Sequence, residues 1–310
     1  MIPSPGTVRC AERGEPGWPE RLEHLGSSPA RLWVRGVLPA GDTACVAVVG
    51  SRRATPGGLL TAREIAVHLV REDITVISGM ARGIDAAAHL GALDGGGTTL
   101  AVLGCGIDVC YPREHHALRD RIAASGCVIS EDAGDAPPDT WRFPRRNRLI
   151  AALAEAVIVV EGTARSGALS TARWGADLGR EILAVPGSIR SPCSEGTNLL
   201  IRDGVRPFLC IGDLFEAVPE LRRGALVGAP GQLAIALTSA PNTAAPPMGA
   251  AGDDAFLRRV LDGLGPDPVH PDELAVALGM ESAPLAAALT TLQLRGAITD
   301  VYGGRVARTV

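Results

Sequence analysis

Residues 45–50 read CVAVVG, residues 57–72 read GGLLTAREIAVHLVRE, and residues 74–79 read ITVISG. The first and third stretches are short apolar runs that end in Gly, which is typical of buried parallel strands. The middle stretch has the apolar spacing of an amphipathic helix. Together they predict a strand–helix–strand unit, the building block of a doubly wound parallel sheet.

The same alternation continues toward the C-terminus. Further strands are expected at 98–104, 126–131, 156–162 and 181–187. Helices are expected between them at 83–93, 115–125, 146–155 and 166–179. Strand and helix alternate throughout, so the sequence predicts an α/β fold built on one doubly wound parallel sheet over residues 43–221.

The length of 310 residues indicates about two domains. Residues 222–252 are rich in Gly, Ala, Pro and Ser and have no sustained period, which predicts a flexible linker. Residues 253–310 read as a small helical unit that ends in a two-stranded hairpin around Gly303 and Gly304. Residues 1–42 are expected to form an N-terminal approach segment to the sheet.

Composition excludes several kinds of chemistry. All 30 basic side chains are Arg, so there is no Walker-A, Schiff-base or kinase-type lysine. Apolar stretches are interrupted by charge well before a membrane span is reached, and the N-terminus lacks the apolar region of a secretory signal. Seven Cys without a CxxC argue against a disulfide framework or a zinc site and favour a reducing cytoplasm. No metal and no cofactor are predicted.

In such sheets, ligands bind beyond the carboxyl ends of the strands. The loops expected there are rich in Gly, hydroxyl groups and Arg, and poor in carboxylates. Gly allows a close approach of the backbone, and free N–H groups at helix N-termini attract anions. The sequence therefore predicts a ligand that contains phosphate, held by Arg, hydroxyl groups and backbone amides.

Two of these loops carry an arginine suited to a phosphate. GSRRATPGG at 50–58 follows the first strand of the alternation, and its Arg52 could fork onto a phosphate. SGMARGIDAAAH at 78–89 opens a helix and carries Arg82. Asp85 in that helix is interpreted as an N-terminal charge that favours the helix dipole, and His89 as a packed helix residue.

WRFPRRNRLIAA at 141–152 carries four Arg in seven residues, with Trp141 and Phe143 among them. Arginine can meet a nucleic-acid backbone while an aromatic ring stacks on any base, which is what single-stranded nucleic acid requires. SGALSTA at 166–172 adds hydroxyl groups at a helix start, where either phosphate binding or simple capping by Ser166 is consistent with the pattern.

Seven ordered motifs resemble one known family, the DNA-processing protein A family (DprA, also called Smf). They are VAVVGSR, VISGMARGIDAAAH, AVLGCGIDVCYP, FPRRNR, VVEGTARSGALSTA, VPGS and GTNLLIRDG. The resemblance extends from about Trp18 to Val218. It implies an extended Rossmann-like domain in a cytoplasmic bacterial protein, followed by a small winged-helix-like domain at the C-terminus.

The resemblance also implies a function. Members of this family bind single-stranded DNA, protect incoming DNA during natural transformation, help to load the RecA recombinase and dimerise through the Rossmann-like domain, without catalytic turnover. Carried over to this sequence, the DNA-binding residues are Ser51, Arg52, Gly79, Met80, Arg82, Gly83, Phe143, Arg145, Asn147, Arg148, Ser166, Gly167 and Thr171. In a chain without Lys the pocket must rely on Arg, centred on Arg52, Arg82, Arg145 and Arg148.

Two departures from the family are visible. About 40 residues precede the first strand of the alternation, too few for the SAM-like domain that many relatives carry in addition to a connecting segment. The C-terminal unit holds five Arg against eight acidic residues, which argues against duplex binding and predicts a protein-interaction or accessory role. Residues 43–218 hold 18 Arg and 20 acidic residues, so DNA affinity must come from a local patch.

Two other functions remain open at this point. One is a nucleotide-processing enzyme on a related Rossmann-like fold, similar to the cytokinin-activating phosphoribohydrolases. Their PGGxGTxxE stretch supplies a Glu, whereas VEGTARSGALSTA has none after its Gly-Thr, and Glu131 and Glu161 lack a paired base. The other is a structural scaffold whose DNA binding is incidental.

Overall fold

The computed structural model describes residues 7–222, 254–264, 269, 271–280, 282–295, 297–301 and 305–308. The chain divides into two compact units, Met1–Ala229 and Pro230–Val310, and each is described by itself. Apart from Arg222, the linker predicted at 222–252 lies outside the described residues.

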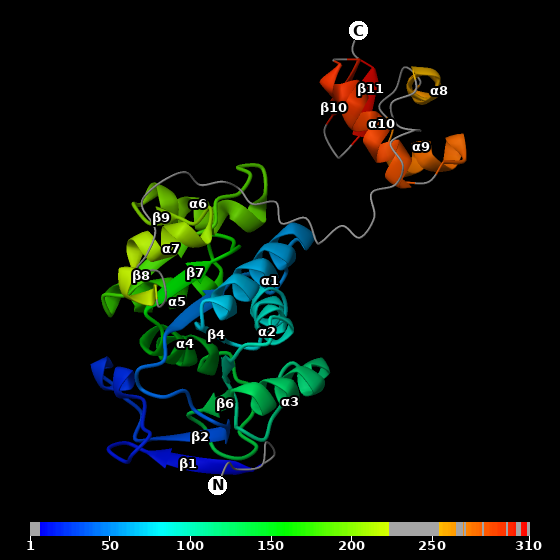
Figure 1. The fold of residues 1–310 in the computed structure, drawn as a ribbon. Coiled ribbons are helices and arrows are strands. Elements are labelled where there is room, and N and C mark those ends of the chain that lie inside the picture. Colours follow the sequence, from blue (N-terminus) through cyan, green and yellow to red (C-terminus); the bar gives the residue numbers. More distant parts are fainter. Residues whose placement is uncertain are drawn as a thin grey trace. The chain divides into compact units, whose positions relative to one another are not determined.

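The first unit is built on a nine-stranded sheet with the order β1-β2-β6-β5-β4-β3-β7-β8-β9 (Figure 1). Seven of these strands run parallel, which confirms the predicted doubly wound sheet. They are β3 (Cys45–Val49), β4 (Thr75–Ser78), β5 (Thr99–Val102), β6 (Cys127–Ser130), β7 (Ala156–Val159), β8 (Glu181–Ala184) and β9 (Arg206–Pro207).

The sheet extends further than the sequence pattern predicted. β1 (Val8–Glu12) and β2 (Arg31–Gly36) belong to it, although we expected only an approach segment in this region. β2 runs antiparallel to β6, with Trp33 opposite Ser130, and β1 runs antiparallel to β2. The buried positions of β2 alternate with less buried ones, the period of a strand with one covered face. Six residues of such alternation are a weak signal, and the partner strand lies about a hundred residues away.

Helices cover both faces of the sheet (Figure 1). α1 (Pro56–Arg71), α2 (Ile84–Asp94), α3 (His116–Ser125) and α7 (Ile211–Ala217) pack on one face. α4 (Arg142–Leu153), α5 (Gly167–Asp177) and the short helix η1 (Glu20–His24) pack on the other, and α6 (Glu195–Arg202) packs near β8. β3 shows why two layers form, because Val46 and Val48 face α1 while Ala47 and Val49 face α4.

The second unit contains α8 (Asp254–Gly263), α9 (Pro271–Leu278), α10 (Ser282–Leu294) and an antiparallel pair, β10 (Ile298–Val301) and β11 (Arg305–Arg308). Leu257, Leu274, Leu285 and Leu289 form its core together with Val306. The helices and the strand pair correspond to the elements expected from the sequence, whereas the predicted turn residues Gly303 and Gly304 lie outside the described residues.

Candidate functional site

A cavity of about 800 Å³ opens at the carboxyl edge of the sheet in the first unit. The chain leaves β3 in one direction through β4, β5 and β6, and then crosses to the other side of β3 for β7, β8 and β9. The order of the strands therefore reverses between β3 and β7, and ligands of open α/β sheets bind in the crevice at such a point. The cavity is lined by residues that follow β3 and β7 and by the first turns of α4 and α5.

The loop after β3 brings Ser51, Arg52 and Arg53 to the cavity wall. The Oγ atom of Ser51 accepts a hydrogen bond of 3.0 Å from the backbone N–H of Arg53, which shapes the turn. Both arginines are exposed, and within the part of the chain that the structure describes neither forms an ion pair. The Cζ atom of Arg52 lies 4.7 Å from the ring centroid of Phe143, a cation–π contact.

One face of α4 also lines the cavity, through Phe143, Arg146, Asn147 and Ile150. These positions are spaced by three, four and seven residues, so they share one side of the helix. Phe143 lies 5.6 Å from Tyr111, another cavity residue, measured between ring centroids. The cavity thus combines aromatic rings with guanidinium and amide groups.

Arg146 is 6% exposed and is the deepest cation of this wall. Its Nη1 atom donates a hydrogen bond of 2.8 Å to the carbonyl oxygen of Gly79 and another to that of Val102. Its Nε atom is buried and has no hydrogen-bond partner among the residues that the structure describes. Burial lowers the pKa of Arg146 to about 10, so the guanidinium stays protonated near neutral pH.

The remaining arginines of α4 have carboxylate partners. Arg145 and Arg148 both lie 2.7 Å from an oxygen of Glu131, and Arg142 lies 2.5 Å from Asp132. These acids follow β6 directly. The positive charge of this side of α4 is therefore largely neutralised within the protein.

Two buried titratable groups lie on α2 near Arg146. Asp85 lines the cavity, and burial raises the pKa of its carboxyl group. Its Oδ2 atom accepts a hydrogen bond of 3.4 Å from the N–H of Ala81, consistent with the expected role at the start of the helix. His89 is fully buried beside Thr99, with 2.7 Å between Nδ1 and Oγ1, and burial lowers the pKa of His89 to about 3.

The loop before α2 supports the cavity from behind. Gly83 has φ = 76° and lies so close to the carbonyl oxygen of Ser51 that a Cβ atom would collide with it. The backbone N–H of Ile84 donates a hydrogen bond of 3.1 Å to the same oxygen. Arg82 points elsewhere and pairs with Glu114 at 2.5 Å. This loop therefore positions the Ser51 turn, and it contributes the small side chain of Ala81 but not that of Arg82 to the cavity wall.

The start of α5 completes the wall. Ser166 is the N-cap, and its Oγ atom accepts a hydrogen bond of 3.3 Å from the N–H of Ala168. Asn147 donates from Nδ2 to the carbonyl oxygen of Gly167 at 3.1 Å and so joins α4 to α5. Glu161, after β7, accepts hydrogen bonds from the N–H and the hydroxyl of Thr55, the N-cap of α1. These bonds hold together the three loops around the cavity.

The structure brings some of the predicted site residues to the cavity wall and not others. Those on the wall are Ser51, Arg52, Phe143, Asn147, Ser166, Gly167 and Thr171. Those that do not line it are Gly79, Met80, Arg82, Gly83, Arg145 and Arg148. An arginine pocket centred on Arg52, Arg82, Arg145 and Arg148 is thus not what the structure assembles, since the last three are ion-paired outside the cavity.

Several cavity residues were missed by the sequence prediction, above all Arg146, together with Arg53, Tyr111, Thr140 and Thr163. One signal could have identified Arg146. Helical spacing from Phe143 selects 146, 147 and 150 as one face of the helix.

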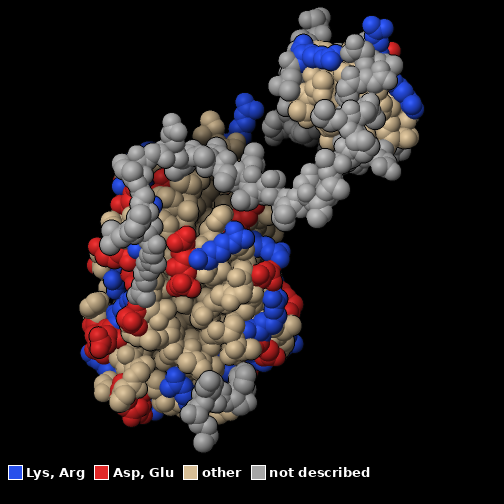
Figure 2. All heavy atoms as spheres, in the orientation of Figure 1, with Lys and Arg blue, Asp and Glu red and all other residues tan. Residues whose placement is uncertain are grey.

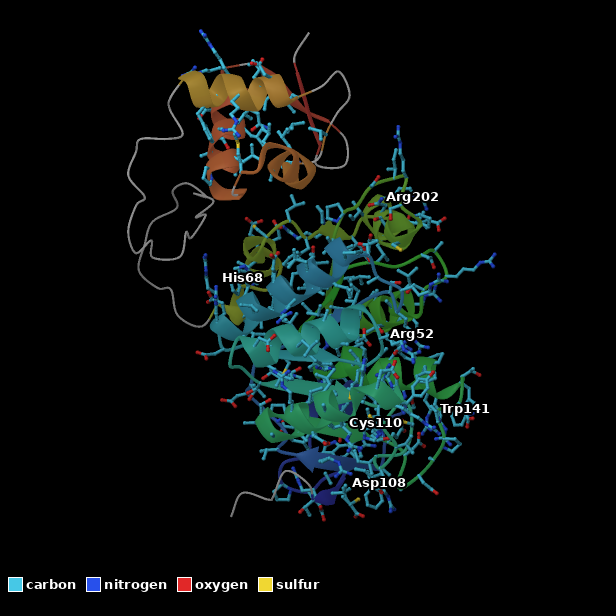
Figure 3. All side chains as sticks on the ribbon, turned by 90° about the vertical axis from the view of Figure 1, so that its right-hand side faces the viewer. Arg52, His68, Asp108, Cys110, Trp141 and Arg202 are labelled. Carbon is cyan, nitrogen blue, oxygen red and sulfur yellow. The ribbon has the colours of Figure 1, made fainter. Side chains whose placement is uncertain are left out.

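Charge at the surface of the first unit is mixed. The face shown in Figure 2 carries acidic and basic side chains interspersed, without a broad basic area. Arg52 and Trp141 lie along one edge of the unit in Figure 3. The face seen in Figure 2 therefore offers no broad electrostatic attraction for an anion.

Comparison with known proteins identifies the family. The model of the family described as DNA recombination-mediator protein A matches residues 9–219. The chain belongs to the DprA/Smf family. The DprA winged helix domain matches residues 244–304, which establishes the class of the second unit.

Individual DprA relatives agree with this assignment. A putative DNA processing protein DprA of Mycobacterium tuberculosis is 38% identical over 287 residues, covering 92% of this chain and 70% of the relative. DNA processing protein DprA of Streptococcus pneumoniae is 39% identical over 189 residues, covering 61% of this chain and 67% of the relative.

Solved DprA structures share the fold. The Streptococcus pneumoniae protein has a TM-score of 0.65 at 35% identity and covers 67% of this chain and 74% of its own. DNA processing protein A of Helicobacter pylori, described with a single-stranded DNA binding mode, has a TM-score of 0.63 at 26% identity. That match covers 70% of this chain and 98% of the Helicobacter protein.

Proposed function

We propose that this protein binds single-stranded DNA in the cavity at the carboxyl edge of its sheet, as a binding protein without catalytic turnover. The observation that carries the proposal is the pair Arg52 and Arg53, two exposed guanidiniums that form no ion pair with any residue the structure describes, beside the rings of Phe143 and Tyr111. The guanidiniums can bind the phosphates of a DNA strand, and the aromatic rings can stack on its unpaired bases. A duplex hides its base faces and cannot use the rings.

The contact between Arg52 and Phe143 adds a step to binding. The guanidinium lies over the ring, at the place that a stacked base would take. A base that stacks on Phe143 must therefore displace Arg52, which is then available to a phosphate of the same strand. The cation–π contact keeps the ring covered until DNA arrives.

The family and its relatives support a wider role. We propose that the protein acts in natural transformation, where it protects incoming single-stranded DNA in the cytoplasm and loads the RecA recombinase, and that it works as a homodimer through its Rossmann-like unit. The acidic winged-helix unit serves an accessory or protein-interaction role in this proposal. In the described part of the chain, no helix has the length and apolar character that crossing a bilayer requires.

Fluorescence anisotropy with labelled oligo-dT and with a hairpin duplex of equal length tests the proposal. We expect tighter binding to oligo-dT. Phe143→Ala should weaken oligo-dT binding by about 1–3 kcal/mol, whereas Phe143→Tyr, which keeps a ring, should retain most of the affinity. Equal affinity for both DNAs, or full affinity in Phe143→Ala, would contradict the proposal. RecA loading is tested separately by the rate of RecA ATP hydrolysis on single-stranded DNA.

A further inference from the structure

Trp141 is an exposed aromatic residue at the rim of the cavity. It is the N-cap residue of α4 and is 55% exposed, unlike Trp18, which is buried, and Trp33 and Trp174, which are half-buried. Its neighbours in sequence, Thr140 and Phe143, line the cavity, but Trp141 itself does not. Figure 3 shows its side chain at the outer edge of the unit. An indole ring that stays this exposed offers an apolar face to a partner.

Two arginines hold the indole in place. The Cζ atoms of Arg142 and Arg145 lie 4.6 and 5.7 Å from the centroid of the Trp141 ring. More than half of the residue remains accessible with both guanidiniums in contact, so ring surface is left for another planar group.

The same arginines are fixed from behind by carboxylates. Arg142 pairs with Asp132 and, at 3.3 Å, with Asp139, while Arg145 pairs with Glu131. A guanidinium engaged in this way is neutralised and oriented, which makes it a poor partner for phosphate but a good support for an aromatic face. The ion pairs therefore hold the two guanidiniums against the ring of Trp141.

We propose that Trp141 is a second base-stacking platform, outside the cavity, over which single-stranded DNA continues after it leaves Phe143. This inference rests on the proposed DNA binding in the cavity. Arg52 and Arg53 supply charge for the phosphates, and Trp141 supplies an open face for the next accessible base. Stacking needs no particular base, so the platform is independent of sequence. Arg142 and Arg145 are positioning residues that act through the indole.

Tryptophan fluorescence of the full chain tests the platform directly, with anisotropy of labelled oligo-dT as a separate measure of binding. A stacked base quenches indole emission, so we expect saturating oligo-dT to quench the wild type. The quench should be lost in Trp141→Phe, which should retain most of the affinity because the phenyl ring still stacks. Trp141→Ala should bind about 5- to 50-fold more weakly. The other three tryptophans provide the constant background.

A double-mutant cycle separates positioning from phosphate contact. Arg145→Ala should weaken oligo-dT binding in the wild type and have little effect in Trp141→Ala, because its contribution passes through the indole. An equal loss in both backgrounds would show that Arg145 contacts DNA itself and would overturn its positioning role.

Stacking on Trp141 and DNA binding in the cavity can fail separately in these experiments. Tight oligo-dT binding without quenching, or with unchanged affinity in Trp141→Ala, would remove the platform and leave the cavity as the DNA site. If the wild type fails to bind oligo-dT in the anisotropy assay, the proposed function fails, and the platform fails with it.

Discussion

The two faces of α4 place arginine in different surroundings. On the cavity face, Arg146 is buried against backbone carbonyl groups, and the nearby Arg52 has no carboxylate partner among the residues that the structure describes. On the opposite face, Arg142, Arg145 and Arg148 are held by Glu131 and Asp132. A run of arginines in the sequence is therefore not a uniform basic surface, because the partners of each guanidinium decide whether it can attract a phosphate.

The largest expected difference between the two faces of α4 is in how much an arginine-to-alanine substitution destabilises the protein. Arg146→Ala removes the donor to the Gly79 and Val102 carbonyls and a positive charge close to the buried Asp85. We expect a loss of about 3–5 kcal/mol in the free energy of unfolding, measured in urea. Arg145→Ala, on the partly exposed face, should cost about 1 kcal/mol or less. Equal losses would show that the two faces do not differ as described.

Acid should lower the free energy of unfolding through the buried His89, which lies near Arg146. Burial lowers the pKa of His89 to about 3 in the folded protein, whereas the unfolded chain takes up the proton near its ordinary pKa of 6.5. Stability attributable to His89 is therefore complete above pH 6.5 and is lost as the pH falls through about 3, by roughly 5 kcal/mol in all. His89→Gln should flatten this part of the pH profile of urea unfolding. An unchanged profile would contradict the burial of a neutral imidazole.

The salt dependence of oligo-dT affinity reports how many arginines contact phosphates. If Arg52, Arg53 and Arg146 are the contacts, the slope of log affinity against log salt for oligo-dT should be roughly −2, since each single-stranded contact contributes about 0.7. Arg52→Ala should reduce its magnitude by about 0.7. A slope twice as steep in the wild type would mean that the ion-paired arginines of α4 also release counterions.

Much of the fold could be predicted from the sequence because strand and helix signals alternate locally. The run at Cys45–Val49 and its successors carry that signal, and they predicted the edge on which the cavity opens. β2 was missed because its pairing with β6 joins residues far apart in the chain.

The site was harder to predict than the fold. Motif position indicated Arg52 and Phe143 correctly as cavity residues, but it could not show that Glu131 neutralises Arg145 and Arg148. Arg146 was hidden among four arginines, and only the phase of the helix distinguishes it from its neighbours. The absence of Lys makes this distinction sharper, since every cation of the site is a guanidinium with a fixed geometry.

Oligo-dT affinity of two matched variants tests the central claim most directly. Arg52 and Arg82 are both exposed and both follow strands of the parallel sheet. Arg52 lines the cavity and has no ion pair within the described part of the chain, whereas Arg82 pairs with Glu114. By anisotropy, we predict that Arg52→Ala weakens binding by about 1–3 kcal/mol and that Arg82→Ala changes it by less than about 0.5 kcal/mol. Equal losses in the two variants, or a larger loss in Arg82→Ala, would contradict the assignment of the cavity as the DNA site.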